Sequence, residues 1–194
     1  MSIRISRGIA PGQRAQAAQL YWRAFGGKLG RVLGPERKAM RYVERVLAPD
    51  HALAAVDPAG QVLGVIGFRT RAGAFVGGTR SDLVAIYGRF GAAWRATCLS
   101  LIAEDLPQGV LLVDGLAVDQ ARRGEGIGAA LVRALCAEAA ARGYAEVRLD
   151  VVDENIRARA LYDRLGFVVL RRSDRWLTRV MFDFRSALVM ARRL

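Results

Sequence analysis

A glycine-rich loop joins a predicted strand, residues 110–118, to the helix that follows it. Gly124, Gly126 and Gly128 carry no side chain, so a ligand can approach the backbone closely. The first amides of a helix have no partner within the helix, and the helix dipole favours an anion at that end. The loop therefore predicts a site for a phosphate or a pyrophosphate.

Three kinds of phosphate-binding loop compete for this segment, to which Arg122 and Arg123 add positive charge. A Walker loop needs a lysine followed by Ser or Thr, and Gly128-Ala129-Ala130 supplies neither. A dinucleotide fingerprint would have Ala129 in place of its third glycine. A coenzyme A loop, Arg/Gln-x-x-Gly-x-Gly/Ala, matches the run that begins at Arg123 and ends at Gly128. The remaining alternative is a glycine-rich turn that binds nothing.

Asp114 is a carboxylate inside the apolar strand 110–118. Strict alternation puts it on the same face as Leu112, Leu116 and Val118. A carboxylate that is removed from water on that face becomes a stronger proton acceptor, which suits a general base. Two structural alternatives stay open, namely an Asp-Gly hairpin turn and a buried carboxylate paired with an arginine.

The elements that must position these residues alternate regularly from residue 110 onward. This order predicts an α/β (α+β) fold with a mixed central sheet flanked by helices. The expected strands cover 3–6, 51–56, 62–68, 110–118, 144–152, 167–172 and 187–192. The expected helices run from Pro11 to about Phe25, from Pro35 to about 47, from 126 to 142 and from 155 to 165, with Gly26, Gly27, Gly30 and Gly34 breaking the first. Residues 57–60 predict a hairpin turn, and 173–185 are expected to be irregular or briefly helical.

Residues 71–109 form a predicted helical insert between the third and fourth of these strands. Ser81 or Asp82 could cap its helix, and Gly88 and Gly91 allow two shorter helices instead. Apolar residues recur there at helical spacing and must be buried against something. We expect Tyr87, Phe90 and Trp94 to line the part of a site that binds a substrate. We also expect the insert to supply a dimer contact.

The composition fits one domain over residues 1–194, with 53% apolar residues and a formal net charge of +12. Such a charge attracts anions, but the arginines are scattered and form no tract interleaved with aromatic residues, so nucleic acid is an unlikely main partner. The sequence shows no secretory signal and no membrane span. Cys98 and Cys136 are expected to be reduced thiols in a cytoplasmic protein, and a single histidine argues against a His-based metal site.

A second motif carries the resemblance to a known family. Asn155-Ile-Arg-Ala-Arg-Ala-Leu-Tyr162-Asp-Arg-Leu-Gly-Phe167 follows the glycine loop at a suitable distance, and Leu116-Ala-Val118 precedes the loop. Together these segments resemble the GNAT superfamily of N-acetyltransferases, strongly over 110–172 and by order of elements over 1–70. The chain departs from the family pattern in its insert of roughly 40 residues.

This resemblance implies acetyl coenzyme A as cosubstrate and no metal. It implies that Tyr162 is the acid that protonates the leaving thiolate, that Asp114 is the base at the acceptor amine, and that Asn155 bonds the pantetheine arm. The backbone of the strand before the loop would pair with that arm, and one of its amides would polarise the thioester carbonyl. The full set of residues expected to hold the coenzyme is Leu116, Ala117, Val118, Arg122, Arg123, Gly124, Glu125, Gly126, Ile127, Gly128, Ala129, Asn155 and Arg159.

The leading hypothesis is an acyltransferase that moves an acetyl group directly to a primary amine of a small molecule or a peptide. One alternative is a non-catalytic module that binds or senses acyl coenzyme A. A second is a basic nucleic-acid-binding protein.

Overall fold

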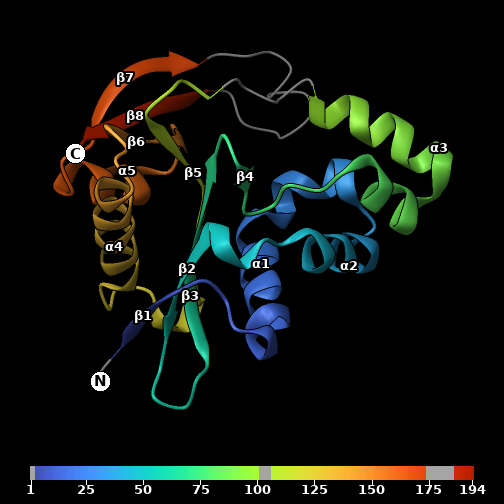
Figure 1. The fold of residues 1–194 in the computed structure, drawn as a ribbon, viewed down its shortest axis with the longest axis horizontal. Helices are drawn as coiled ribbons and strands as arrows, with labels where there is room; N and C mark the ends of the chain where they lie inside the picture. The colour runs from blue at the N-terminus through green and yellow to red at the C-terminus, as the bar shows by residue number, and fades with distance from the viewer. Residues whose placement is uncertain (1–2, 101–105, 174–185) are drawn as a thin grey trace.

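A computed structural model describes residues 3–100, 106–173 and 186–194. Its centre is a mixed sheet in the order β1-β2-β3-β5-β6-β8-β7, with the short β4 paired to β3 (Figure 1). The strands are β1 Arg4–Arg7, β2 Ala52–Val56, β3 Val62–Thr70, β4 Gly73–Ala74, β5 Val110–Val118, β6 Glu146–Val152, β7 Val168–Ser173 and β8 Ala187–Arg193. The α-helices are α1 Arg14–Leu33, α2 Glu36–Val46, α3 Arg80–Ser100, α4 Ile127–Ala141 and α5 Ile156–Arg164. Single-turn 3₁₀ helices cover Pro11–Gln13, Pro49–His51 and Gln120–Arg122.

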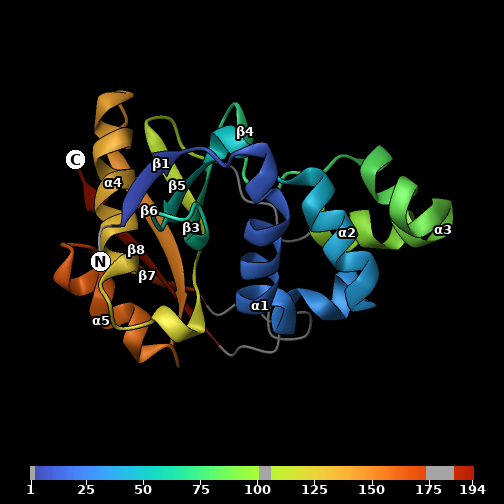
Figure 2. The same cartoon turned by 90° about the horizontal axis from the view of Figure 1, so that it is seen from below.

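Each face of the sheet is covered by its own group of helices. Figure 2 shows α4 and α5 on one face and α1, α2 and α3 on the other. One apolar core joins Val65 and Ala117 to the α1–α3 side, and a second joins Leu111 and Ile66 to α4 and α5. The predicted mixed sheet with flanking helices is confirmed, and the two faces offer two separate surfaces for a site.

The hairpin of β2 and β3 forms where the turn residues predict it. The amide of Gly60 donates to the carbonyl of Asp57 at 3.0 Å, and Gly60 adopts a φ of 82° that favours glycine. The elements of the second half also begin and end within a few residues of their predicted bounds. The predicted irregular segment 173–185 lies, apart from its first residue, outside the described residues.

The first helix is longer than the sequence predicts. The glycines were expected to end it near Phe25, but α1 continues to Leu33 and Gly34 caps it. Tertiary packing explains the difference, because Val32 and Leu33 are buried in the core of the α1–α3 side. The helix gains more from burying them than its glycines cost in backbone entropy.

Gly26 and Gly27 differ in what a methyl group would meet, which gives a matched pair of variants. A Cβ at Gly26 would lie 2.7 Å from the buried Trp22 ring, whereas a Cβ at Gly27 has no heavy atom within 4 Å. We expect Gly26→Ala to lower the free energy of unfolding by about 1–3 kcal/mol through overpacking. Gly27→Ala should raise it by up to about 1 kcal/mol through helix propensity. Urea denaturation measures both, and equal effects of the two changes would contradict the described path of α1.

The insert contains one kinked helical element that starts with a different cap from the predicted one. Gly88 has a φ of 73° inside α3, so two helical segments meet there, as its glycines allowed. Thr79, rather than Ser81 or Asp82, is the capping residue. Its hydroxyl accepts from the amide of Asp82 at 3.3 Å, and its own amide donates to the Asp82 carboxylate at 2.9 Å.

The Asp82 carboxylate gives the fold a defined acid sensitivity. Hydrogen bonds from Thr79, together with Arg45 Nε at 2.8 Å, lower the pKa of Asp82 to about 2. The folded state thus favours the charged form, so this contribution is complete above the ordinary value of 3.8 and disappears as the pH falls toward 2. We expect Asp82→Asn to destabilise the protein at pH 7, and the difference from wild type to shrink at pH 3. Thermal unfolding at both values measures this, with Glu44→Gln as an exposed control; a constant difference would contradict the assignment.

Candidate active site

The strands β5 and β6 are hydrogen bonded over only their first three residue pairs. Val110, Leu111 and Leu112 pair in parallel with residues 146–148, after which the register ends although both strands continue. On its other edge β5 stays paired with β3 as far as Val118. From residue 113 onward, the edge of β5 that faces β6 therefore carries main-chain donors and acceptors without a neighbouring strand.

The glycine loop lies directly beyond this edge and presents a row of unpaired amides. Ala130 is the first residue of the helix whose amide finds an acceptor, the Gly126 carbonyl at 3.0 Å. Within the described part of the chain, the amides from Gly124 to Ala129 donate to no protein group. Gly124 and Gly126 adopt φ values of 93° and 81°, and a Cβ on either would meet open space. These amides, at the positive end of α4, fit the pyrophosphate of a coenzyme.

The predicted coenzyme residues Leu116 and Val118 come together with the loop on the α4 side of the sheet, whereas Ala117 faces the α1 side. A Cβ at Gly128 would lie 3.6 Å from Leu116, 3.8 Å from Val118 and 3.5 Å from Leu161. Leu161 on α5 is a neighbour that the sequence did not single out. Its place in the Leu-Tyr pair of the second motif is the signal that could have found it.

Charge at the loop is partly neutralised by the protein itself. Arg122 forms an ion pair with Glu125 at 2.9 Å, which ties the two ends of the loop together. Arg123 is exposed and forms no ion pair within the described residues. Ile127 is buried and anchors the first turn of α4 to the core, so the backbone rather than its side chain faces the loop.

Asp114 shares a face with Leu112, as strict alternation predicts, but not with Leu116 and Val118. The register with β3 shifts at this point, because Gly115 pairs with Gly67 while Val113 pairs with Phe68. Asp114 is the extra residue of a β-bulge, and the bulge reverses the alternation beyond it. It therefore faces the α1 side, as Leu112 does, whereas Leu116 and Val118 face α4.

The Asp114 carboxylate is held by two donors in a nearly buried position. Arg69 Nη2 donates to Oδ1 at 3.0 Å, and the amide of Val76 donates to Oδ2 at 3.3 Å. The side chain is 10% exposed. Asp114 is thus paired with an arginine, as one structural alternative requires, and its role as a base stays a prediction. The hairpin alternative is excluded because β5 runs through the residue without a turn.

Two aromatic residues of α1 enclose the same spot, and sequence reasoning did not identify them. A Cβ at Gly115 would lie 2.7 Å from Phe25 and 3.2 Å from Tyr21. Burial, with the Asp114 charge adding to it, raises the pKa of the Tyr21 hydroxyl, so Tyr21 keeps its proton at neutral pH. The spacing of these rings, one helical turn apart in a predicted helix, is the only signal that the sequence offers for them.

The residues of the second motif take different positions on α5. Asn155 caps the helix, and its side chain accepts from the amide of Ala158 at 3.1 Å. Arg159 is turned outward toward Asp163, at 3.9 Å. Tyr162 is buried beside Phe167, and burial raises its pKa to about 12. Because of this raised pKa, the hydroxyl keeps its proton at neutral pH. Within the described chain the hydroxyl makes no hydrogen bond, so no protein group competes for it.

The predicted acceptor-side residues of the insert are not brought together with Asp114. The α3 helix lies beyond α2 as seen from the sheet (Figures 1 and 2). Tyr87 is buried and donates its hydroxyl to the Leu33 carbonyl at 2.5 Å, which is a structural contact. Phe90 is 94% and Trp94 is 45% exposed, on the outer side of this layer.

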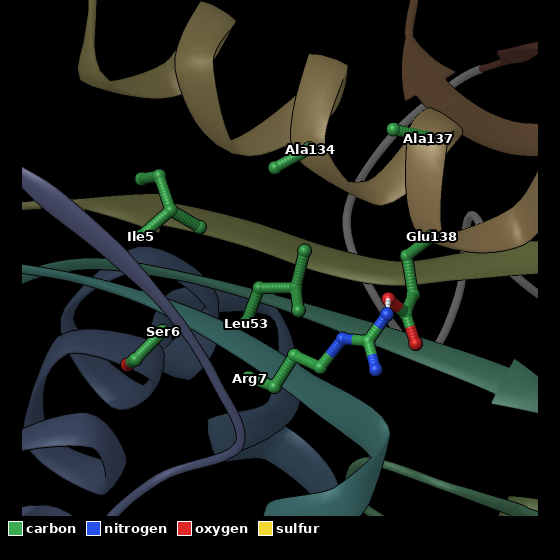
Figure 3. Close-up of a pocket in the computed structure, with 7 residues that line it drawn as sticks. All are labelled: Ile5, Ser6, Arg7, Leu53, Ala134, Ala137 and Glu138. Atoms are coloured by element: carbon green, nitrogen blue, oxygen red, sulfur yellow. Dashed lines mark ion pairs between the residues drawn. The ribbon is translucent and has the colours of Figure 1, made fainter. Parts of the chain in front are cut away.

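A separate pocket of about 320 Å³ lies between β1, β2 and the middle of α4 and contains none of the predicted site residues (Figure 3). Its polar end is Glu138, which forms ion pairs with Arg7 and, at 2.7 Å, with Arg142. This cluster ties the first strand to α4. Among the described residues no group of His, Cys, Asp and Glu side chains suits a metal ion, and no helix is long and apolar enough to cross a membrane.

Comparison with known proteins agrees with this geometry. The model of the acetyltransferase (GNAT) family matches residues 15–167. An N-acetyltransferase from Staphylococcus aureus Mu50 superposes with a TM-score of 0.72 at 15% identity, covering 97% of this chain and 100% of the other. A GCN5-related N-acetyltransferase from Kribbella flavida gives 0.67 at 18%, covering 99% and 98%. The ribosomal-protein-S18-alanine N-acetyltransferase from Escherichia coli gives 0.58 at 16%, covering 99% and 94%. The search of curated proteins found no match.

The loop geometry makes a direct prediction for coenzyme A binding. We expect Gly126→Asp to weaken the affinity at least about tenfold more than Gly126→Asn, because only aspartate adds a negative charge at the positive helix end. Asparagine is the matched control, since it has the same shape and tolerates the positive φ of this position. Calorimetry with coenzyme A measures the difference. Equal affinities for the two folded variants would contradict a phosphate site at this loop.

Proposed function

Because the chain belongs to the GNAT acetyltransferase family, we propose that it moves the acetyl group of acetyl coenzyme A directly to a primary amine in a ternary complex. The observation that carries the proposal is the unpaired edge of β5 in line with the unpaired amides of the glycine loop. The extended pantetheine arm of the coenzyme can pair with the edge of β5 as an added strand would, while the diphosphate binds the amides of the loop.

The residues present fit such a coenzyme. The amides from Gly124 to Ala129 would hold the pyrophosphate, with Arg123 adding charge, and Leu116 and Val118 would pair with the pantetheine arm. Asn155 keeps its side-chain NH₂ available for that arm while its oxygen caps α5. When bound, the coenzyme supplies an acetyl group activated as a thioester.

The chain supplies three actions around the reacting carbon. A β5 amide, at Leu116 or Val118, donates to the carbonyl oxygen of the acetyl group and stabilises the charge that develops there. The Asp114 carboxylate orients the acceptor amine and takes its proton, directly or through water. The Tyr162 hydroxyl donates a proton to the departing sulfur. Asp114 and Tyr162 lie on opposite faces of the sheet, so in this proposal they act from opposite sides of the reacting carbon.

Two other functions compete with acetyl transfer. A module that only binds or senses acyl coenzyme A would need the loop but not Tyr162 or Asp114, and both are present. A nucleic-acid-binding protein would need the basic surface but not the loop. We therefore favour catalysis in the cytoplasm on a small-molecule or peptide amine; a homodimer formed through the insert stays a prediction.

A coupled screen tests the activity. The purified protein is mixed with acetyl coenzyme A and panels of amines, amino acids and peptides, and thiol release and the acetylated product are both followed. Thiol release that depends on an amine, with matching product, supports the proposal. Tight coenzyme binding without transfer to any panel would favour the sensing module instead.

Removal of the Tyr162 hydroxyl tests its role in the reaction separately from any role in coenzyme binding. We expect Tyr162→Phe to lower kcat by about 10²–10⁴-fold while coenzyme A affinity stays close to wild type, because only the proton donor is removed. Tyr144→Phe, a change of the same type in the turn before β6, is the control and should leave kcat unchanged. Full turnover by Tyr162→Phe would reduce Tyr162 to a packing residue.

A further inference from the structure

The positive charge of the chain is concentrated in the helical layer on the Asp114 side of the sheet. Helices α1, α2 and α3 contain 11 Lys and Arg residues against 3 Asp and Glu, a net charge of +8 out of +12 for the whole chain. On the opposite face, α4 and α5 together contain 4 arginines against one aspartate and one glutamate, a net charge of +2. The arginines are scattered along the sequence, which suggests an even distribution of charge, but in the fold the charge is unevenly distributed.

Much of this charge is not compensated within the protein. Arg37 and Arg41 are exposed, stand one turn apart on α2, and repel each other, which costs the helix stability. Lys38 lies beside them. Within the described residues none of the three forms an ion pair, and the same holds for Arg80 and Arg89 on α3. Fold stability does not explain this arrangement, and such an excess of exposed cations attracts anions.

The layer connects this charge to the reaction site. Tyr21 and Phe25 of α1 enclose the Asp114 position, α2 packs on α1, and α3 packs on α2 (Figure 2). Asp114 and these basic helices lie on the same side of the sheet. From Arg37 to Arg41 the surface extends by one turn, about 6 Å. The exposed cations also continue from α2 onto α3, where Arg80 and Arg89 are exposed.

The same layer also exposes an aromatic pair. Phe90 and Trp94 stand one turn apart on α3 and are both exposed, and the guanidinium of Arg95 stacks over Trp94 at 4.7 Å. Exposed aromatic side chains next to cations commonly anchor a polypeptide partner. A second copy of this chain fits poorly, because it would bring a second charge of +8 against the first.

We propose that the acceptor is an acidic polypeptide whose carboxylates dock on the basic face of α2 and α3 while its amine reaches Asp114. The proposal rests on the proposed function and adds the class of acceptor to it. Arg37, Lys38 and Arg41 bind the acidic segment, and Phe90 with Trp94 contacts an apolar side chain of it. This surface raises the local concentration of acceptor and leaves the chemistry to the residues at β5 and α5.

The experiment compares two peptides of equal length, each with a free terminal amine. One is rich in Asp and Glu, and the other has Asn and Gln at the same positions. With saturating acetyl coenzyme A at low salt, we expect kcat/KM to be about tenfold or more higher for the acidic peptide, mainly through KM. The advantage should shrink in 0.5 M salt, where charges are screened within a few ångströms. Equal kcat/KM values for the two peptides would overturn the proposal.

Variants locate the effect on the molecule. The double change Arg37→Gln with Arg41→Gln should remove most of the preference for the acidic peptide. Arg133→Gln is the matched control, since Arg133 is an exposed arginine on α4 at the other face. Coenzyme A affinity reports whether each variant is folded. An equal loss of preference in both variants would overturn the assignment to α2.

Two further outcomes separate this proposal from its competitors. If small amines are acetylated and neither peptide is, the acceptor class is wrong while the proposed function stands. If coenzyme binds but no amine is acetylated, the proposed function itself fails.

A single-stranded oligonucleotide of the same charge as the acidic peptide is tested as a competitor. Oligonucleotide binding that needs Arg37 and Arg41 and is not displaced by the acidic peptide would assign the surface to nucleic acid and overturn the proposal.

Discussion

The end of pairing between β5 and β6 after Leu112 and Arg148 is the constraint on which the rest of the structure depends. Buried main-chain groups need hydrogen-bond partners, and a strand edge inside a sheet is the least favourable place to leave them without one. The split is therefore stable only where water or an extended ligand completes the edge. The glycine loop follows the same strand, so the ligand that completes the edge is placed at once against the positive end of α4.

The β-bulge at Asp114 turns this gap into a place for chemistry. With strict alternation, Asp114 would share a face with Leu116 and Val118 and would compete for the space beside the coenzyme loop. The extra residue moves it to the α1 side, among Tyr21, Arg69 and Val76, while Tyr162 stays in the core on the α4 and α5 side. The proposed proton acceptor and the proposed proton donor thereby lie on opposite faces of the sheet and form no pair with each other.

The parts of this site that could be predicted are those whose geometry is set by neighbouring residues in the sequence. Three glycines between a strand and a helix determine the loop, and Asn155 before a helical run determines a cap, so both could be found from the sequence. Thr79 was missed for a local reason, since Ser81 and Asp82 are equally suitable caps and only the reciprocal bond of Asp82 decides between them.

Features determined by tertiary contacts could not be predicted in this way. The bulge at Asp114 depends on how β3 and β5 register against each other across roughly 45 residues, and nothing in the strand itself signals it. The passage of α1 through Gly26, Gly27 and Gly30 depends on the burial of Val32 and Leu33. The fold class was predictable because it follows from the order of elements, whereas the separation of Asp114 from the face of Leu116 and Val118 was not.

The distribution of charge carries the division between the two faces one step further. A coenzyme with a diphosphate is itself strongly anionic, yet the α4 face meets it mainly with backbone amides, and Glu125 is paired with one of the two loop arginines. Backbone amides at a helix end need no net positive charge to hold phosphate. The excess of +8 on α1, α2 and α3 is therefore not accounted for by such a coenzyme, and these helices cover the face of the sheet on which Asp114 lies. In this arrangement the coenzyme would be held by amides on the α4 face, and the acidic acceptor would be held by cations on the α1 to α3 face. The two anionic substrates would then remain apart until they meet at β5.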